Sequence, residues 1–200
     1  MRDKQSRDIQ LQDLFTTEEL EALLTAKKER YHNLDSRNKV LISLLVYQAL
    51  KPNEIEALRC DEINLDQATI YIKPSAKNNS RTLGLKANQI LLFKSYLEET
   101  RPKLLQENKS ASFIIGHRKE PMTAEDITKH IKRNYTIYKP RKVNAMTIRQ
   151  SVITNLLKMG VDLRLVQSFA GHKYPSTTER YKQNNVQELQ EALKKYHPMK

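Results

Sequence analysis

The feature that most constrains the fold is a single pair of β-rich segments in a chain that otherwise carries helical signals. Residues 68–72 are β-branched and aromatic, and residues 81–85 form a second such segment that we interpret as the pairing partner. The polar stretch 74–80 between them predicts a hairpin loop longer than a two-residue turn. We expect residues 112–115 to form a third strand.

Helical signals fill most of the remaining sequence. Thr16 and Glu19 form a capping box, Pro52 opens a helix where its missing N–H costs nothing, and Gly160 is a helix stop residue. The segment from about Ser36 has a broad apolar surface and predicts a central core helix. The other expected helices begin at 16 and 51 or cover about 87–106, 123–135, 146–159, 162–170, 176–183 and 186–195.

These elements predict a mainly α fold with a small antiparallel β-sheet, an α+β class, and the chain has only four glycines. Residues 1–15 are polar and are expected to be a flexible N-terminal segment. A single domain is expected over 16–185, followed by a C-terminal helix and tail over 186–200. Two hundred residues are enough for a sizeable core.

The charge of the chain favours a polyanionic partner. Lys and Arg outnumber Asp and Glu 35 to 23, the formal charge is +12 and the pI is about 9.7. These values are typical of nucleic-acid-binding proteins, although a basic, solvated surface would give them as well. A single cysteine, Cys60, excludes an internal disulfide and a multi-cysteine zinc site.

The chain carries no signal for a membrane. No apolar run approaches the ~20 residues of a membrane span, and the N-terminal sequence MRDKQSRD is too polar for a signal peptide. We therefore expect a cytoplasmic protein.

A string of residues near the C-terminus carries the chemistry. Arg149 precedes Gly171-His172, and Tyr181 follows the histidine nine residues later. Together with Thr147–Ser151 and the segment 50–66, this string resembles the tyrosine recombinase (phage integrase) family. The resemblance covers roughly residues 16–185 and depends on several separated motifs in the right order.

The resemblance implies a recombinase catalytic-domain fold and a site-specific recombinase or integrase that breaks and rejoins double-stranded DNA through a 3′-phosphotyrosyl intermediate. It assigns Tyr181 as the nucleophile and Arg149 and His172 as phosphate-binding residues. Cationic donors of this kind stabilise the extra charge of a phosphorane-like state, and the covalent link requires neither ATP nor metal, so we expect no cofactor and no metal. Taken alone, Tyr181 would more often be a half-buried aromatic residue on an amphipathic helix.

The remaining family positions match less closely. Lys51 stands where the family has its first arginine, and it keeps the charge but loses the planar fork. Met146 stands where an earlier histidine is expected, so a general base is missing. The hairpin lysine that serves as general acid best matches Lys77, with Ala76 as the competing position and Lys73 as a weaker substitute. Lys77 could equally be a solvated loop charge.

A basic stretch between 117 and 142 is interleaved with tyrosines and predicts contacts to DNA phosphates. The alternative is a solvated helix face. The residues that we predict to bind DNA are Lys129, Lys132, Arg133, Lys139, Arg141 and Lys142.

Two rival functions remain at this point. The departures at Lys51 and Met146 favour a catalytically impaired or inactive DNA-binding protein that retains the recombinase fold. Charge alone supports a remoter RNA-binding or ribosome-associated protein.

Family members usually carry an N-terminal DNA-clamping domain, which about 15 residues cannot supply. They assemble as homo-tetramers on DNA, often by exchanging a C-terminal helix, for which 186–195 is the expected segment, although this segment could equally pack on its own subunit.

Overall fold

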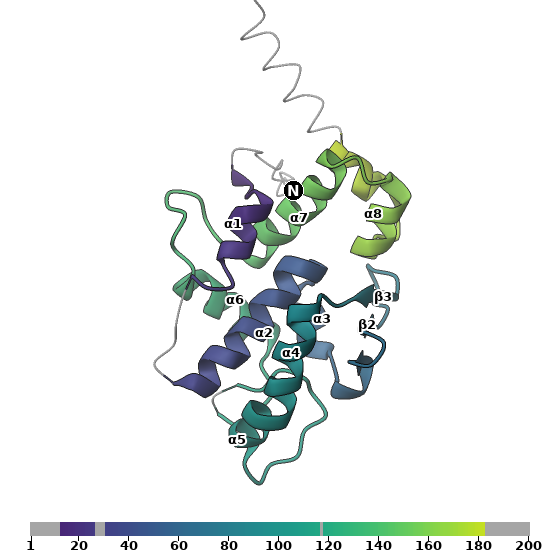
Figure 1. The fold of residues 1–200 in the computed structure, drawn as a ribbon. Helices are drawn as coiled ribbons and strands as arrows, with labels where there is room; N and C mark the ends of the chain where they lie inside the picture. The colour runs from purple at the N-terminus through teal and green to yellow at the C-terminus, as the bar shows by residue number, and fades with distance from the viewer. Residues whose placement is uncertain (1–12, 27–30, 117, 183–200) are drawn as a thin grey trace, which may run out of the picture.

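A long buried helix forms the centre of the fold. The computed structural model describes residues 13–26, 31–116 and 118–182. Helix α2 (His32–Gln48) runs through the middle of the molecule, as Figure 1 shows, and its fully buried residues include Val40, Leu41, Leu44 and Leu45. The predicted central core helix is thus confirmed. The helix begins four residues before the expected start at Ser36. The sequence did not indicate this start, because the N-cap residue, Tyr31, is not a typical capping residue and makes no side-chain cap hydrogen bond.

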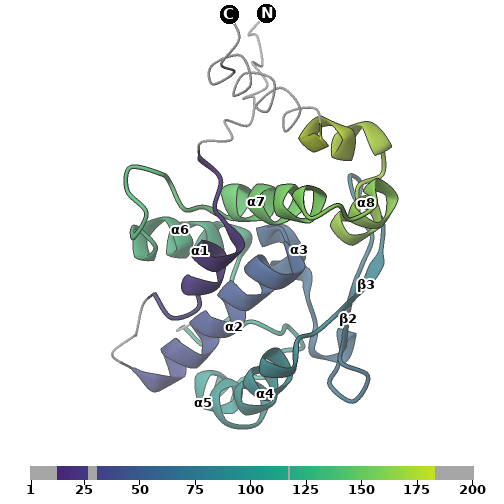
Figure 2. The same cartoon turned by 45° about the horizontal axis from the view of Figure 1, so that its top comes forward.

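Shorter helices pack around α2. α7 (Ala145–Lys158) packs along one side of α2, and α1 (Thr17–Ala22) packs against α7. α4 (Ala87–Ser95) and α5 (Arg101–Leu105) pack on another side of α2 (Figure 2). The remaining helices are α3 (Pro52–Ala57), which packs on α6 (Ala124–Asn134), and α8 (Leu163–Ala170), which packs on α7. Residues 175–182 are also helical.

The helix boundaries follow the local signals where a cap or stop residue is present. Thr16 and Glu19 form the expected capping box at α1, and Thr123 caps α6. Pro52 is the first residue of α3, and Gly160 after α7 has a φ of 81°.

The helix expected over 87–106 is divided into three parts. α4 is followed by a π-helical turn, Tyr96–Thr100, and then by α5. Pro102 lies in the first turn of α5, and a proline has no N–H and crowds the carbonyl four residues earlier. A π turn before it lets the Arg101 N–H reach the Tyr96 carbonyl, so the chain stays helical through the proline.

The sheet is a three-stranded antiparallel meander. β2 (Thr69–Ile72) pairs with β3 (Arg81–Gly84), with Ile70 opposite Leu83, and this confirms the predicted hairpin. Ile70, Ile72, Arg81 and Leu83 are buried, whereas Tyr71 and Thr82 are exposed, so the sheet has one face on the core. The prediction of a mainly α fold with a small antiparallel sheet is confirmed.

The prediction of the third strand is wrong. The third strand is β1 (Ile63–Asn64), which pairs with β2, while residues 112–115 make only isolated bridges. The Tyr96 hydroxyl donates to the Phe113 carbonyl and accepts from the Ile115 N–H, and the other backbone groups of the run bond to Leu58 and Met122, so its partners are divided among several segments instead of one strand. A short apolar run shows that a segment is buried but does not determine its pairing.

The packed region begins one residue before the expected domain limit at residue 16. Phe15 is 1% exposed and its N–H donates to the Ser151 hydroxyl on α7. Residues 1–12 and the helix expected over 186–195 lie outside the described residues.

Within the described ranges, no helix combines the length and the apolar character needed to cross a bilayer. The same ranges contain no group of three metal-ligating side chains.

Candidate active site

Four chain segments meet beside α7, around Arg149. The start of α3, the β2–β3 hairpin, α7 itself and the segment after α8 are brought together there, because α8 packs against both α7 and β3 (Figure 2). The backbone of the hairpin pairs directly with this last segment: Asn78 and His172 form an antiparallel bridge, and the Asn79 N–H donates to the Gly171 carbonyl over 2.9 Å. Predicted site residues that lie far apart in the sequence therefore share one site.

Gly171 is required for this close approach. Its φ is 68°, a left-handed conformation that disfavours other residues, and it caps α8. A Cβ at this position would lie 2.6 Å from Arg81 Nη1 and 3.1 Å from the Asn79 carbonyl oxygen. Any side chain would push the hairpin away from His172.

Arg149 is held between the ends of two helices. Its side chain is buried, with Nη1 donating to the carbonyl of Ala49 and Nη2 to the carbonyl of Ala170, each over 2.6 Å. Ala49 is the C-cap of α2 and Ala170 ends α8, and the C-terminus of a helix carries partial negative charge that favours a cation. Burial lowers the pKa of Arg149, but an arginine remains charged at any working pH. A guanidinium has five N–H groups, so others remain for a phosphate.

His172 contacts Arg149, and the contact fixes its tautomer. Nε2 lies 3.1 Å from Arg149 Nη2, and Nδ1 lies 2.9 Å from the Thr178 hydroxyl oxygen. A guanidinium only donates, so Nε2 accepts and Nδ1–H donates to Thr178. Burial, with the charges of Arg149, Lys51 and Arg81, lowers the pKa of His172 to about 4. His172 is therefore neutral at physiological pH.

This pKa shift predicts that acid destabilises the chain through His172. Between the unfolded pKa of about 6.5 and the folded value of about 4, the unfolded chain binds the extra proton. The stability due to neutral His172 is complete above pH 6.5 and is lost as the pH falls toward 4. We expect the native chain to lose roughly 2 kcal/mol more than His172→Gln between about pH 7 and pH 4.5 in urea unfolding. Equal losses would show that the folded histidine keeps an ordinary pKa.

Tyr181 lies beside His172 on the helix 175–182. The two rings are stacked, with centroids 6.1 Å apart and planes 11° apart, and Tyr181 also packs on the small cluster of Ile153, Val166 and Ala170. Burial raises the pKa of Tyr181, and the charges of Arg149 and Arg180 partly offset the effect. The hydroxyl is thus protonated at neutral pH and must lose its proton during any attack on phosphorus.

Lys51 enters the site from the N-cap of α3. Its Nζ donates to the Asn78 side-chain oxygen over 2.7 Å. Burial lowers the pKa of Lys51, the charges of Arg149, Arg81 and Lys77 lower it further, and Glu54 opposes the shift. At this position the family pattern has an arginine, and a lysine offers a single ammonium group in place of a planar guanidinium.

Three residues that sequence analysis missed support Lys51. Glu54 and Arg81 form a buried, bidentate ion pair over 2.9 and 3.0 Å, and the Asn78 amide donates to Glu54 over 3.2 Å. The Lys51 N–H also donates to Glu54 over 2.9 Å, so the same carboxylate satisfies a backbone donor at the start of α3. Burial raises the pKa of Glu54, but the Arg81 and Lys51 hydrogen bonds and the Arg81 and Arg149 charges outweigh burial and make the net shift downward.

The sequence held partial signals for these residues. Glu54 stands three positions after the N-cap, where a capping box requires Glu or Gln. Arg81 alternates with the buried Leu83 on β3, and a charge on the inner face of a strand needs a partner. We find no signal in the sequence for Asn78, and Thr178 belongs to the string that resembles the family but nothing there indicated its contact with His172.

The other predicted catalytic positions lie near this cluster or outside it. Lys77 is exposed on the hairpin directly before Asn78, and its charge acts on Lys51. Lys73 pairs with Glu62 over 2.6 Å instead. Met146 is 69% exposed in the first turn of α7, one turn before Arg149.

The predicted DNA-binding residues differ in what they contact. Arg141 donates to the Leu14 carbonyl and to Glu19, and it lies over the rings of Phe15 and Tyr138. Lys129 pairs with Glu125, an exposed contact that contributes little. The exposed residues of the set also include Lys132, Arg133, Lys139 and Lys142.

Comparison with known proteins places the chain among recombinases. It is 28% identical to the tyrosine recombinase XerD of Staphylococcus saprophyticus, over 96% of this chain and 64% of the relative. It is 29% identical to XerC of Natranaerobius thermophilus, over 96% of this chain and 65% of the relative. The chain thus spans just under two thirds of the length of these relatives.

Solved structures give the same result for the fold. The site-specific recombinase XerH, bound to a palindromic difH substrate in a post-cleavage complex, superposes with a TM-score of 0.73 at 29% identity, over 90% of this chain and 52% of that chain. The XerA recombinase superposes with a TM-score of 0.72 at 21% identity, over 94% of this chain and 66% of that chain. The sequence model of the phage integrase family matches residues 13–188, and the chain therefore belongs to the phage integrase, or tyrosine recombinase, family.

Proposed function

We propose that the chain is the catalytic part of a site-specific DNA recombinase or integrase. The observation that carries the proposal is the contiguous array in which Tyr181 stacks on His172 and His172 contacts the buried guanidinium of Arg149. A phosphate that reaches Arg149 would lie beside the Tyr181 hydroxyl. Relatives named as tyrosine recombinases, and the complexes of XerH with its difH substrate, support double-stranded DNA as the source of that phosphate.

The proposed reaction exchanges one phosphodiester bond for another. The Tyr181 oxygen attacks phosphorus and forms a 3′-phosphotyrosyl bond, the bond from phosphorus to the 5′ oxygen breaks, and the tyrosine proton leaves to a phosphate oxygen or water. Lys77 supplies the proton that the departing 5′ oxygen needs. Arg149 and Lys51 hold the non-bridging oxygens and stabilise their charge. A second 5′ hydroxyl reverses the sequence, and no ATP is consumed.

A catalytically inactive DNA-binding role is the weaker alternative. Met146 cannot accept a proton, but a phosphate oxygen or water can take the tyrosine proton instead, and a lysine side chain at the first position can still supply a cation. Arg149, His172 and Tyr181 all lie at the site. The expected consequence of the departures is slower cleavage rather than none.

The test of the proposed function does not require a known target site. The chain is incubated with sheared DNA from the organism that encodes it, denatured in detergent, and the covalent protein–DNA adducts are precipitated and sequenced. We expect adducts at a recurrent sequence, attached through the 3′ phosphate and leaving a free 5′ hydroxyl. DNA that is retained without covalent attachment would favour the inactive alternative.

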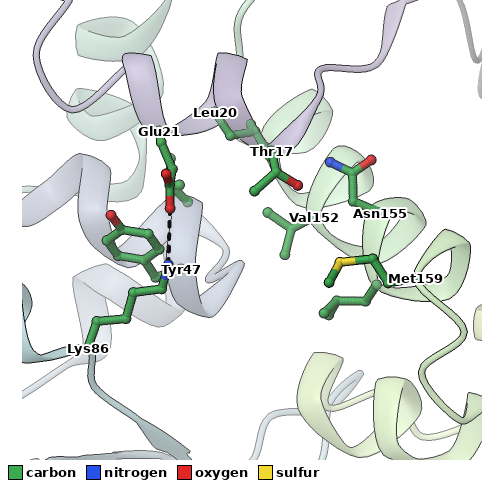
Figure 3. Close-up of a pocket in the computed structure, with 10 residues that line it drawn as sticks. Thr17, Leu20, Glu21, Tyr47, Lys86, Val152, Asn155 and Met159 are labelled. Atoms are coloured by element: carbon green, nitrogen blue, oxygen red, sulfur yellow. Dashed lines mark hydrogen bonds and ion pairs between the residues drawn. The ribbon is translucent and has the colours of Figure 1, made fainter.

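We also propose that the chain assembles as a tetramer on DNA by exchanging its C-terminal segment. An apolar groove between α1, the end of α2 and α7 supports this proposal (Figure 3). The groove is lined by residues that include Leu20, Val46, Val152, Leu156 and Met159, and the Glu21–Lys86 ion pair lies at its edge. In the sequence, Leu189 and Leu193 have the spacing of an apolar helix face that would fit such a groove.

A substitution in the groove tests this assembly. Met159 is 74% exposed, so Met159→Glu should leave the fold intact while burying a charge if a second copy docks there. We expect the tetramer on DNA to weaken at least about tenfold in mass photometry, since an unpaired charge in an interface costs several kcal/mol. The matched control is Leu91→Glu on α4, 72% exposed and outside the groove, which should leave assembly unchanged. Equal assembly in both variants would rule out the groove.

A further inference from the structure

We infer that Asn78 is a positioning residue that allows a lysine to serve at the first phosphate-binding position. The inference rests on the proposed function and concerns the same site. Asn78 is 5% exposed and lies between the Lys51 ammonium and the Glu54 carboxylate. It belongs to the hairpin and contacts both the start of α3 and the His172 segment.

The orientation of the Asn78 amide follows from its two neighbours. An ammonium can only donate and a carboxylate can only accept, so the amide oxygen faces Lys51 and the NH₂ group faces Glu54. Glu54 is itself fixed by the bidentate bond from Arg81. The chain of contacts therefore runs from a rigid, buried ion pair through Asn78 to the tip of Lys51.

Lysine needs this support more than arginine would. An ammonium on four methylene groups has free rotation and no fork that aligns it on a phosphate. The 2.7 Å bond to Asn78 uses one of its three N–H groups and fixes the position of Nζ, which leaves two groups for phosphate oxygens. A displacement of about 1 Å in such a group can cost about 10²-fold in rate.

The backbone of Asn78 ties this contact to the rest of the site. Asn78 forms the bridge with His172, and the residue before it is Lys77, the proposed general acid. Seating the hairpin therefore aligns Lys51 and places Lys77 at the site in one step. Asn78 touches no reacting atom in this arrangement, because it acts through Lys51.

Single-turnover cleavage of a nicked suicide substrate tests the inference. With protein in excess over DNA, Asn78→Ala should slow formation of the covalent adduct by about 10- to 100-fold. The DNA affinity should change less than about threefold, because the charge of Lys51 remains. The matched control is Asn79→Ala, since Asn79 is exposed in the same loop and contacts Gly171 through its backbone. A native rate in Asn78→Ala would overturn the inference.

Two further measurements separate positioning from a general effect on the hairpin. In a Lys51→Ala background, Asn78→Ala should add less than about threefold, because both changes remove the same interaction. On a substrate with a neutral methylphosphonate at the scissile position, the transition state carries one negative charge fewer and one non-bridging oxygen instead of two, so the loss caused by Asn78→Ala should be clearly smaller than on the phosphate substrate. Fully additive losses, or an equal loss on the neutral substrate, would overturn the inference.

The contact can also be tested without DNA or activity. The changes in Tm caused by Asn78→Ala and Lys51→Ala should be non-additive in the double variant, since the bond exists in the free chain. Additive changes would contradict the contact itself. If the native chain forms no adduct but the Tm values are non-additive, the proposed function fails while the Asn78–Lys51 link remains.

Discussion

Replacing Tyr181 with phenylalanine should abolish the covalent protein–DNA adduct while leaving the folded chain and its DNA affinity unchanged. The substitution removes one oxygen, the atom that forms the bond to phosphorus, so we expect adduct formation to fall by at least about 10³-fold. The phenyl ring can keep the stacking on His172 and the packing against Ile153 and Val166. The free energy of unfolding should therefore change by less than about 1 kcal/mol.

The measurement uses a nicked suicide substrate and separates adduct from free protein by denaturing gel. Tyr174→Phe is the matched control, because Tyr174 lies between His172 and Tyr181 in the sequence but is 69% exposed. This control should form adduct at the native rate. Adduct that persists in Tyr181→Phe and disappears in Tyr174→Phe would move the nucleophile to the other tyrosine.

Local signals were enough to predict most of the fold. The hairpin was predictable because β-branched residues in 68–72 and 81–85 flank one polar loop, and the α1, α3 and α6 helices carry an N-cap or proline at their starts. The third strand was not predictable, because the buried run at 113–115 divides its hydrogen bonds between the Tyr96 side chain and the backbones of Leu58 and Met122. These partners are set by the tertiary packing around the run and not by its own sequence.

Some residues of the candidate site were also predictable from the sequence, and others depend on tertiary contacts. The resemblance places Arg149, His172 and Tyr181 in sequence order, and the structure brings them together. It gives no indication that Asn78 holds Lys51, because that bond joins residues 27 positions apart through a loop side chain. Loop conformation depends on tertiary contacts, here the backbone bonds between the hairpin and the Gly171-His172 segment.

The sequence also does not show which basic side chains are already engaged within the folded chain. Arg141 was grouped with the DNA-binding residues because it lies in a basic stretch, but its guanidinium contacts Glu19 and the Leu14 carbonyl. It thereby joins the loop before α7 to the start of α1. A basic residue is available to phosphate only to the extent that the folded chain leaves its donors free, and composition does not contain that information.

Replacing Arg149 with lysine should separate the effect of charge from that of geometry at the centre of the site. Lysine keeps one positive charge but cannot donate to the Ala49 and Ala170 carbonyls and to a phosphate in the same plane. We expect adduct formation to fall by about 10²- to 10³-fold, the usual loss when a fixed donor to a developing charge is removed. DNA affinity should fall far less, because many other phosphate contacts supply it.

The same residue should also be needed for stability. Arg149→Ala leaves two buried carbonyls at helix ends without their donors, so we expect the free energy of unfolding to fall by roughly 2–4 kcal/mol. Arg149→Lys should lose less than the alanine variant, because an ammonium can still reach one carbonyl. Urea unfolding measures both losses, and Arg164→Lys on the exposed side of α8 serves as the control that should change neither stability nor cleavage. For cleavage, the loss of a bidentate donor to the transition state has to lower the rate. If Arg149→Lys cleaves within about threefold of the native rate, the charge of residue 149 suffices and its planar geometry is not needed.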